Sequence, residues 1–148
     1  MHERIIRVAA DGSAGSRRAL EWALAEAQLR DCAVELVGVY SPSEGGKASS
    51  RTAAEAAVKA TMNDIVAGRA DIPLVSWHVV AGDPGDVLTR ESAHSELLVM
   101  GSHGLESVRH SARASVTDLC TRTADCPVVV VPPPPRADNG SSAVQTGV

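Results

Sequence analysis

The sequence has very few aromatic residues. It contains no phenylalanine, two tryptophans and one tyrosine among 148 residues. Proteins that bind single-stranded nucleic acids stack the bases on aromatic side chains, so this composition argues against that function. The net charge is −4 and the basic residues are scattered, which also disfavours a nucleic-acid partner. The apolar content of 44% suits one globular domain with a core of Val, Leu, Ile and Ala.

Long apolar runs, cysteine pairs and a leader pattern are also missing. No run approaches the roughly 20 apolar residues of a membrane span. The N-terminal Met-His-Glu-Arg leads directly into a strand-like run and has no signal-peptide pattern. Cys32, Cys120 and Cys126 form no Cys-x-x-Cys pair, which argues against a disulfide framework or a zinc site. We therefore expect a cytoplasmic protein with no membrane or nucleic-acid partner.

Two well-known phosphate-binding glycine motifs are absent. No Gly-x-x-x-x-Gly-Lys-Ser/Thr occurs, and the only lysines, Lys47 and Lys59, are not beside such a loop. The sequence therefore disfavours a P-loop kinase or GTPase. No Gly-x-Gly-x-x-Gly follows the first strand-like segment either, which disfavours a Rossmann dinucleotide-binding domain.

Apolar strand-like segments alternate with segments of helical periodicity along most of the chain. This alternation predicts an α/β fold, an open five-stranded parallel sheet with helices on both faces and right-handed crossovers. The expected strands are residues 4–10, 33–40, 74–81, 97–100 and 128–131. The expected helices are residues 16–30, 52–67, 84–94 and 115–124.

Several polar residues at segment ends have local structural explanations. The turn cluster at residues 11–15 can cap the helix that follows, and Thr52 to Glu55 matches a capping box. Asp83 suits an N-cap position, and its neighbour Asp86 has no third ligand nearby for a metal. His78, alone in a strand, is expected to be a satisfied sheet residue and not a ligand.

The chain is organised around the stretch from Leu97 to Val116. Its apolar run stops at Gly101, as in a strand buried on both faces, and a helix is expected to begin near Ser115. A helix N-terminus presents unpaired N–H groups and a partial positive charge, and both suit phosphate. This stretch is a candidate anion site for a nucleotide, although a turn with no ligand fits the spacing equally well.

The carboxyl ends of three expected strands carry Asp11, Val39 and Gly101. In open α/β sheets the ligand site lies outside these ends, where the strand order reverses. Asp11 is either a turn residue, which its position favours, or a carboxylate that binds a ligand. The residues alone therefore predict a crevice of nucleotide size and no more.

Four segments in the right order resemble the universal stress protein family. They are Val-Ala-Ala-Asp-Gly-Ser at residues 8–13, Gly-Asp-Pro at 82–84, Cys-Pro-Val-Val-Val-Val at 126–131, and a glycine signature. The signature is Gly101-Ser102-His103-Gly104, nine further residues, then Ala114-Ser115. It resembles the family's Gly-x-x-Gly-(nine)-Gly-Ser/Thr, with alanine in place of the last glycine. The resemblance covers residues 4 to about 132.

The resemblance implies a Rossmann-like three-layer α/β/α sandwich of the adenine nucleotide alpha hydrolase type. The family contains ATP-binding and non-binding members and commonly dimerises. In binding members, the residues matching Ala10, Asp11 and Val39 hold adenine and ribose. The remaining expected cofactor-binding positions, around the ribose and phosphates, are Met100, Gly101, His103, Gly104, Ala114, Ser115 and Val116. The expected cofactor is ATP, with Mg²⁺ offsetting the missing lysine.

Two departures from the family pattern bear on ligand binding. Ala114 adds a methyl group where binding members have glycine. If that position is left-handed, alanine costs roughly 1–2 kcal/mol, and if it only needs space, the methyl group crowds a phosphate. The segment Arg109 to Arg113 is also unusually polar, and its arginines either belong to a solvated loop or reach the phosphates.

Three functional hypotheses follow from this reading. The first is a non-enzymatic ATP-binding regulator of stress responses. The second is a nucleotide-free dimeric interaction module in which Ala114 marks the loss of the ligand. The third is a slow ATPase, for which His103 is the only candidate base.

The domain is expected to span residues 1–132, followed by a Pro-rich disordered tail at 133–148. Val128–Val131 is expected to be an apolar edge strand, and such an edge invites pairing with a second copy of the chain. A homodimer through this strand is therefore predicted, unless the tail or a helix covers it.

Overall fold

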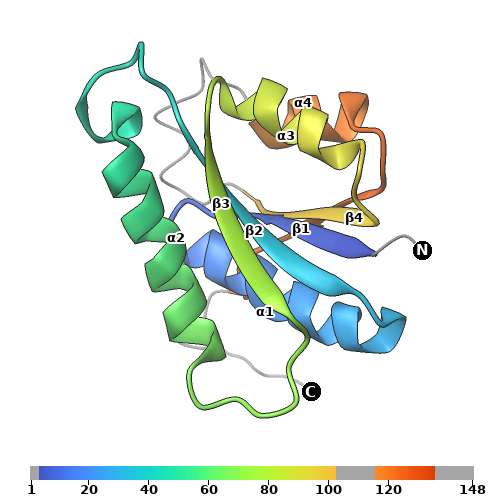
Figure 1. The fold of residues 1–148 in the computed structure, drawn as a ribbon. Coiled ribbons are helices and arrows are strands. Elements are labelled where there is room, and N and C mark those ends of the chain that lie inside the picture. Colours follow the sequence, from blue (N-terminus) through green and yellow to red (C-terminus); the bar gives the residue numbers. More distant parts are fainter. Residues whose placement is uncertain (1–3, 103–115, 136–148) are drawn as a thin grey trace.

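The structure, a computed structural model, describes residues 4–102 and 116–135. A five-stranded parallel sheet with the order β3-β2-β1-β4-β5 forms its centre (Figure 1). The strands are β1 (Ile5–Ala9), β2 (Ala33–Tyr40), β3 (Val75–Ala81), β4 (Leu97–Gly101) and β5 (Val128–Val131). Each bound lies within one residue of the prediction. The strand order reverses between β1 and β4, which are neighbours in space although far apart in sequence.

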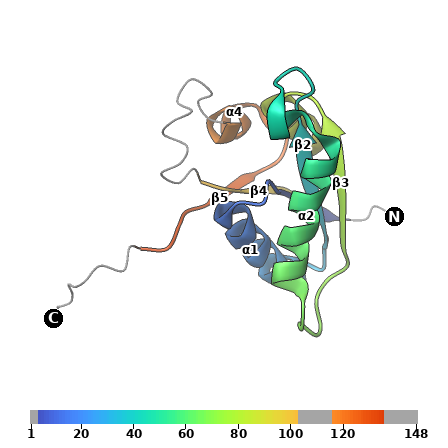
Figure 2. The same ribbon diagram turned by 90° about the vertical axis from the view of Figure 1, so that its left-hand side faces the viewer.

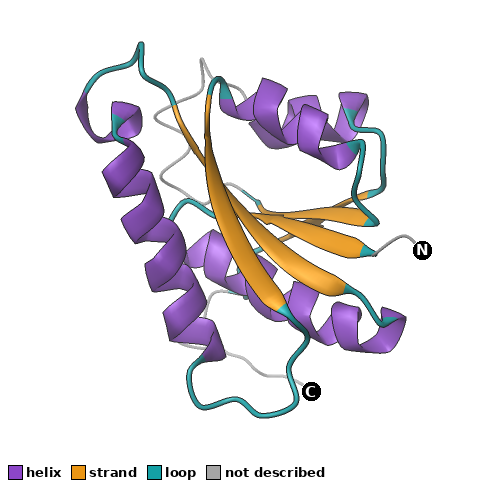
Figure 3. Ribbon diagram, in the orientation of Figure 1, coloured by secondary structure: helices purple, strands orange, loops and turns teal. Residues whose placement is uncertain are grey.

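Among the described residues, two helices cover each face of the sheet (Figures 2 and 3). Helices α1 (Ala14–Arg30) and α2 (Arg51–Val66) lie on one face. Helices α3 (Pro84–Ser92) and α4 (Val116–Thr123) lie on the other. The predicted three-layer α/β/α sandwich is therefore confirmed. None of the helices within 4–102 and 116–135 has the length and apolar content of a membrane span.

The sheet separates two apolar cores. Successive strand residues point to opposite faces, so Ile6 and Val8 of β1 are fully buried against the α1–α2 layer. Val37 of β2 and Met100 of β4 pack on the other face, against α3 and Cys120 of α4. The continuous apolar run of β4 follows from this arrangement, because a central parallel strand is covered on both faces.

Two of the predicted helix caps are confirmed. The Ser13 hydroxyl accepts a hydrogen bond from the Ser16 N–H at 3.2 Å and begins α1. The Asp83 carboxylate accepts from the Asp86 N–H at 3.1 Å and begins α3, with Pro84 in the first turn. Both side chains satisfy backbone donors that a helix start leaves unpaired.

The predicted capping box at Thr52 to Glu55 is wrong. Helix α2 begins earlier, because Ser50 is its N-cap and accepts from the Ala53 N–H at 3.0 Å. Thr52 is therefore already inside the first turn. Glu55 pairs with Arg51 at 3.1 Å, one turn back, and does not take part in a reciprocal cap. The segment between β2 and α2, which lies outside the predicted helices and strands, contains a short 3-10 helix at Gly46–Ser49.

Gly101 is packed directly against the first turn of α1. A Cβ atom on Gly101 would lie 2.6 Å from both the carbonyl carbon and the carbonyl oxygen of Gly15. Backbone atoms cannot rotate away as a side-chain end can, so a methyl group here would push α1 from the end of β4. The first glycine of the signature is thus required by packing, whether or not a ligand binds.

This contact predicts that Gly101→Ala destabilises the protein. Overpacking of this kind costs about 1–3 kcal/mol, which chemical denaturation followed by circular dichroism would measure. Gly15→Ala is the matched control, because a Cβ there would meet the Ser102 carbonyl oxygen at an ordinary 3.5 Å. Equal stability of the two variants would contradict this packing role.

Candidate functional site

The candidate site lies at the carboxyl edge of the sheet, where the strand order reverses. Strand β1 pairs Ala9 with Val37 of β2, so Asp11 and Val39 each lie two residues beyond a paired position. On the other side β1 pairs Val8 with Val99 of β4, and Met100 and Gly101 follow. The parallel register thus brings the ends of β1, β2 and β4 to one edge, as the sequence predicted.

Asp11 forms the first turn after β1. Its Oδ1 accepts a hydrogen bond from the Ser13 N–H at 2.9 Å, and the residue is exposed. The turn function that its position favoured is therefore present. Among the described residues, Oδ2 of Asp11 has no hydrogen-bond partner, so one carboxylate oxygen stays available to a ligand.

The other described residues of the predicted site lie at the same edge of the sheet. Ala10 is 5% exposed, and its N–H donates to the Val37 carbonyl at 2.9 Å. Val39 and Val116 are half-buried and pack on the core of the α3–α4 layer, to which buried Met100 also belongs. Val116 is the first residue of α4.

Four predicted site residues lie outside the described residues: His103, Gly104, Ala114 and Ser115. Their predicted contacts with a nucleotide, and the proposed role of His103 as a base, stay predictions. The same holds for the polar segment Arg109 to Arg113 and for the tail beyond residue 135.

Sequence reasoning missed two polar atoms at this edge. Arg18 Nε and Ser102 Oγ are both buried, and neither has a hydrogen-bond partner within residues 4–102 and 116–135. Both residues lie near Gly15. A Cβ atom on Gly15 would be 3.7 Å from Arg18 Nη2 and 3.5 Å from the Ser102 carbonyl oxygen. Buried polar groups are normally paired, so an orphaned guanidinium nitrogen is notable. In the sequence, nothing distinguishes Arg18 from its neighbour.

The neighbouring Arg17 is fully engaged within the protein. Its guanidinium donates to Asp64 Oδ2 at 2.7 Å and to the Gly12 carbonyl at 2.7 Å. These bonds tie α1 to α2 and to the turn after β1. Of these two arginines, Arg18 is therefore the one whose guanidinium has an unpaired N–H group among the described residues.

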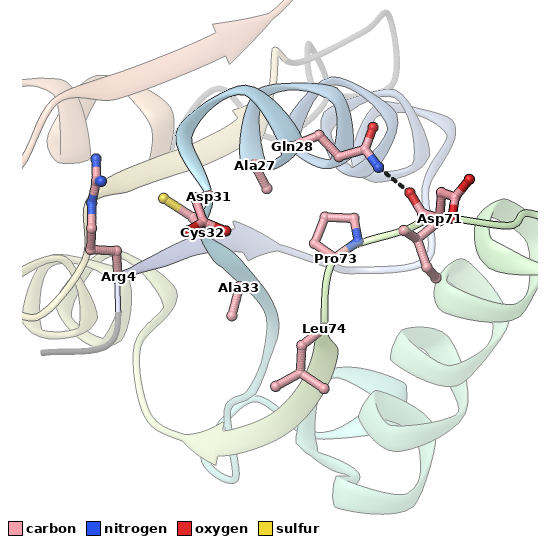
Figure 4. A pocket seen from close by; sticks show the side chains of 10 residues that line it. Arg4, Ala27, Gln28, Asp31, Cys32, Ala33, Asp71, Pro73 and Leu74 are labelled. Atoms are coloured by element: carbon pink, nitrogen blue, oxygen red, sulfur yellow. Dashed lines mark hydrogen bonds between the residues drawn. The ribbon is translucent and has the colours of Figure 1, made fainter. Parts of the chain in front are cut away.

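An open hollow of about 750 Å³ lies at the opposite edge, at the amino ends of the strands. Figure 4 shows Arg4, Asp31 and Cys32 on one side of it and Asp71, Pro73 and Leu74 on the other. Arg4 is paired with Glu96 at 3.1 Å, so its charge is already compensated. The hollow lies at the other end of the strands from Gly101, and no predicted site residue lines it.

The three cysteines do not provide a reactive thiol. Burial raises the pKa of Cys32, Cys120 and Cys126 above the ordinary thiol value. Since the thiolate is the nucleophile, a raised pKa makes each thiol less reactive. No cysteine chemistry therefore belongs to the candidate site.

The sequence and the fold both match known proteins. Residues 3–132 match the model of the Universal stress protein family. A universal stress protein of Mycobacterium tuberculosis is 33% identical over 148 residues, which cover 98% of this chain and 54% of that protein. The chain therefore spans about half the length of this relative.

Two solved structures share the fold. A universal stress protein in complex with cAMP superposes with a TM-score of 0.68 at 22% identity, covering 88% of this chain and 98% of the other. The universal stress protein from Archaeoglobus fulgidus in complex with dAMP superposes with a TM-score of 0.60 at 21% identity, covering 88% and 98%. Together with the match over residues 3–132, the fold and the glycine signature establish that this chain belongs to the universal stress protein family.

Proposed function

We propose that this chain is a non-enzymatic regulatory protein of stress responses that binds ATP at the carboxyl edge of its sheet. The observation that carries the proposal is the meeting of the ends of β1, β2 and β4 where the strand order reverses. In the proposed complex, the N-terminus of α4 at Val116 would present its unpaired N–H groups to the phosphates. Two structures of similar fold hold the adenine nucleotides cAMP and dAMP, which supports this ligand class.

Asp11 is suited to a ribose. Its Oδ1 is held by the Ser13 N–H, which fixes the carboxylate plane. The other oxygen accepts hydrogen bonds from the ribose hydroxyls, and a charged acceptor makes these stronger than neutral ones. Ala10 and Val39 provide a backbone and an apolar surface for the adenine ring.

The phosphates need positive charge, and the sequence has no P-loop lysine to supply it. We assign that charge to Arg18, whose guanidinium has no ion-pair partner among the described residues. Mg²⁺ bound to the phosphates would supply the remainder. The described part of α4 has Asp118 in its first turn, but this carboxylate is paired with Arg122 at 3.3 Å.

The edge position of β5 favours the dimeric module as a second candidate, which is compatible with the first. Strand β5 is bonded to β4 on one side only, and all four of its valines are half-buried. An apolar edge strand is a template for pairing with another chain. Dimerisation through β5 would persist even if Ala114 has abolished nucleotide binding.

Calorimetric titration of ATP with Mg²⁺ tests the nucleotide site. We expect binding that Asp11→Ala weakens at least about tenfold, because a charged hydrogen bond is lost. Ala114→Gly is expected to strengthen binding about tenfold by removing the methyl group. Ser13→Ala is the control, because it removes the hydroxyl that caps α1 and keeps the Asp11 carboxylate that would bind the ribose. Equal losses in Asp11→Ala and Ser13→Ala would attribute the effect to the turn and contradict the assignment.

The phosphate role of Arg18 has a separate test. Arg18→Gln should weaken ATP binding about tenfold and leave adenosine binding unchanged, because adenosine carries no phosphate. Arg17→Gln is the matched control, since that guanidinium is held by Asp64 and Gly12. If Arg18→Gln lowered the affinity for ATP and adenosine equally, Arg18 would not bind phosphate.

A single proline tests dimerisation through β5. The Leu98 N–H donates to the Pro127 carbonyl and the Ser102 N–H to the Val131 carbonyl, so by alternation Val130 turns its own N–H outward. Val130→Pro should therefore remove an edge donor, keep the β4 ladder and yield a folded monomer by light scattering. Val129→Pro, which removes a ladder bond, should unfold the edge. A wild-type monomer at micromolar concentration would refute the dimer.

A further inference from the structure

Four charged or titratable side chains from four elements meet on the face of the sheet that carries α3. They are Arg7 of β1, Glu35 of β2, His78 of β3 and Glu91 of α3. Their side chains are 13%, 20%, 35% and 23% exposed, in that order, so the group is sheltered but open to water. It lies outside the candidate nucleotide site, and no residue of it was predicted to bind a ligand.

The hydrogen bonds of the cluster fix the proton on His78. His78 Nδ1 lies 2.9 Å from Glu35 Oε2, and an ionised carboxylate can only accept a hydrogen bond. Nδ1 therefore carries the hydrogen, which satisfies His78 as a sheet residue in the way the sequence suggested. In the neutral ring the other nitrogen, Nε2, is then a bare acceptor.

Nε2 faces a second acceptor. Glu91 Oε1 lies 3.6 Å from it, so in the neutral ring two acceptor atoms are neighbours. Two acceptors at this separation repel each other unless a cation or a proton lies between them. With a neutral ring the two carboxylates also outnumber the single guanidinium of Arg7, which leaves the cluster one positive charge short.

We propose that a first-row transition metal ion such as Zn²⁺ binds between His78 Nε2 and the Glu91 carboxylate. Zinc bonds to nitrogen and oxygen are about 2.0–2.1 Å long, so neighbouring ligands in a tetrahedral site lie about 3.3–3.4 Å apart. The observed 3.6 Å needs only a small side-chain adjustment. Imidazole with carboxylate suits Zn²⁺, whereas Mg²⁺ and Ca²⁺ prefer all-oxygen sites.

Glu35 is the positioning residue of this site. A metal-binding histidine usually donates its other N–H to a carboxylate, which fixes the ring and raises its basicity. The bond between His78 Nδ1 and Glu35 Oε2 has this form. One ligand atom from each of Glu35, His78 and Glu91 lies within 4.8 Å of the other two, so the three side chains form one compact group.

Arg7 does not block the metal position. Its Nε pairs with Glu35 Oε1 at 2.8 Å and with Glu91 Oε1 at 3.3 Å. Its Nη1 is anchored separately, on the His94 carbonyl at 2.7 Å and Ser95 Oγ at 3.0 Å. The guanidinium therefore keeps its place and its bond to Glu35 when Glu91 turns toward the metal. The cysteine pattern argued against zinc, but this site uses no cysteine.

Calorimetric titration of Zn²⁺ into the untagged, metal-free chain tests the site, with Mg²⁺ as the comparison ion. We expect one Zn²⁺ per chain at micromolar affinity and no Mg²⁺ binding. His78→Gln and Glu91→Gln should abolish binding, and Glu35→Ala should weaken it about 10–100-fold as the ring loses its orientation. The controls are His94→Gln and Glu21→Gln. His94 is an exposed histidine, and Glu21 of α1 is a carboxylate that is paired with Arg69.

Two further measurements keep the test decisive if a variant folds poorly. In the wild-type chain, histidine nitrogen NMR should show that Zn²⁺ shifts Nε2 of His78. The Co²⁺ form should lack the intense sulfur charge-transfer absorption that a thiolate ligand would give. Absence of Zn²⁺ binding, full binding by His78→Gln, or a sulfur band would overturn the proposal, and the first result would leave a proton as the cation between His78 and Glu91.

Discussion

The structure depends on burying β1 and β4 on both faces. These two central strands pair with each other although they are far apart in sequence, and each needs an apolar layer above and below. Helices α1 and α2 supply one layer, and α3 with α4 supplies the other. Because every crossover between parallel strands must return to the same edge, this burial also brings the carboxyl ends of β1, β2 and β4 together. The candidate site is a by-product of how the core is covered.

Most of the fold could be predicted because its signals are local. Apolar runs bounded by turn residues located the strands to within one residue, and Ser13 and Asp83 were read correctly as turn and cap residues. The start of α2 was misplaced because two candidate caps, Ser50 and Thr52, lie two residues apart, and periodicity does not choose between them. Only the backbone geometry at Ser50 decides that choice.

The sites divide in the same way. The common placement of Asp11, Val39 and Gly101 at one edge was predictable, because the end of each strand is visible in the sequence and parallel strands end at a common edge. Nucleotide binding by these residues stays a prediction. The cluster of Glu35, His78 and Glu91 was not predictable, because it depends on the register between β2 and β3 and on where α3 crosses the sheet. The same is true of Arg18 and Ser102, whose unpaired atoms exist only where α1 meets β4.

The contact between Gly101 and Gly15 also bears on how such sequences evolve. A methyl group at Gly101 would collide with backbone 2.6 Å away, so selection for a folded protein preserves this glycine without any help from a ligand. A lineage that lost its nucleotide would therefore still keep a glycine at position 101. Gly101 by itself is therefore a mark of the fold and carries no information on whether a ligand binds.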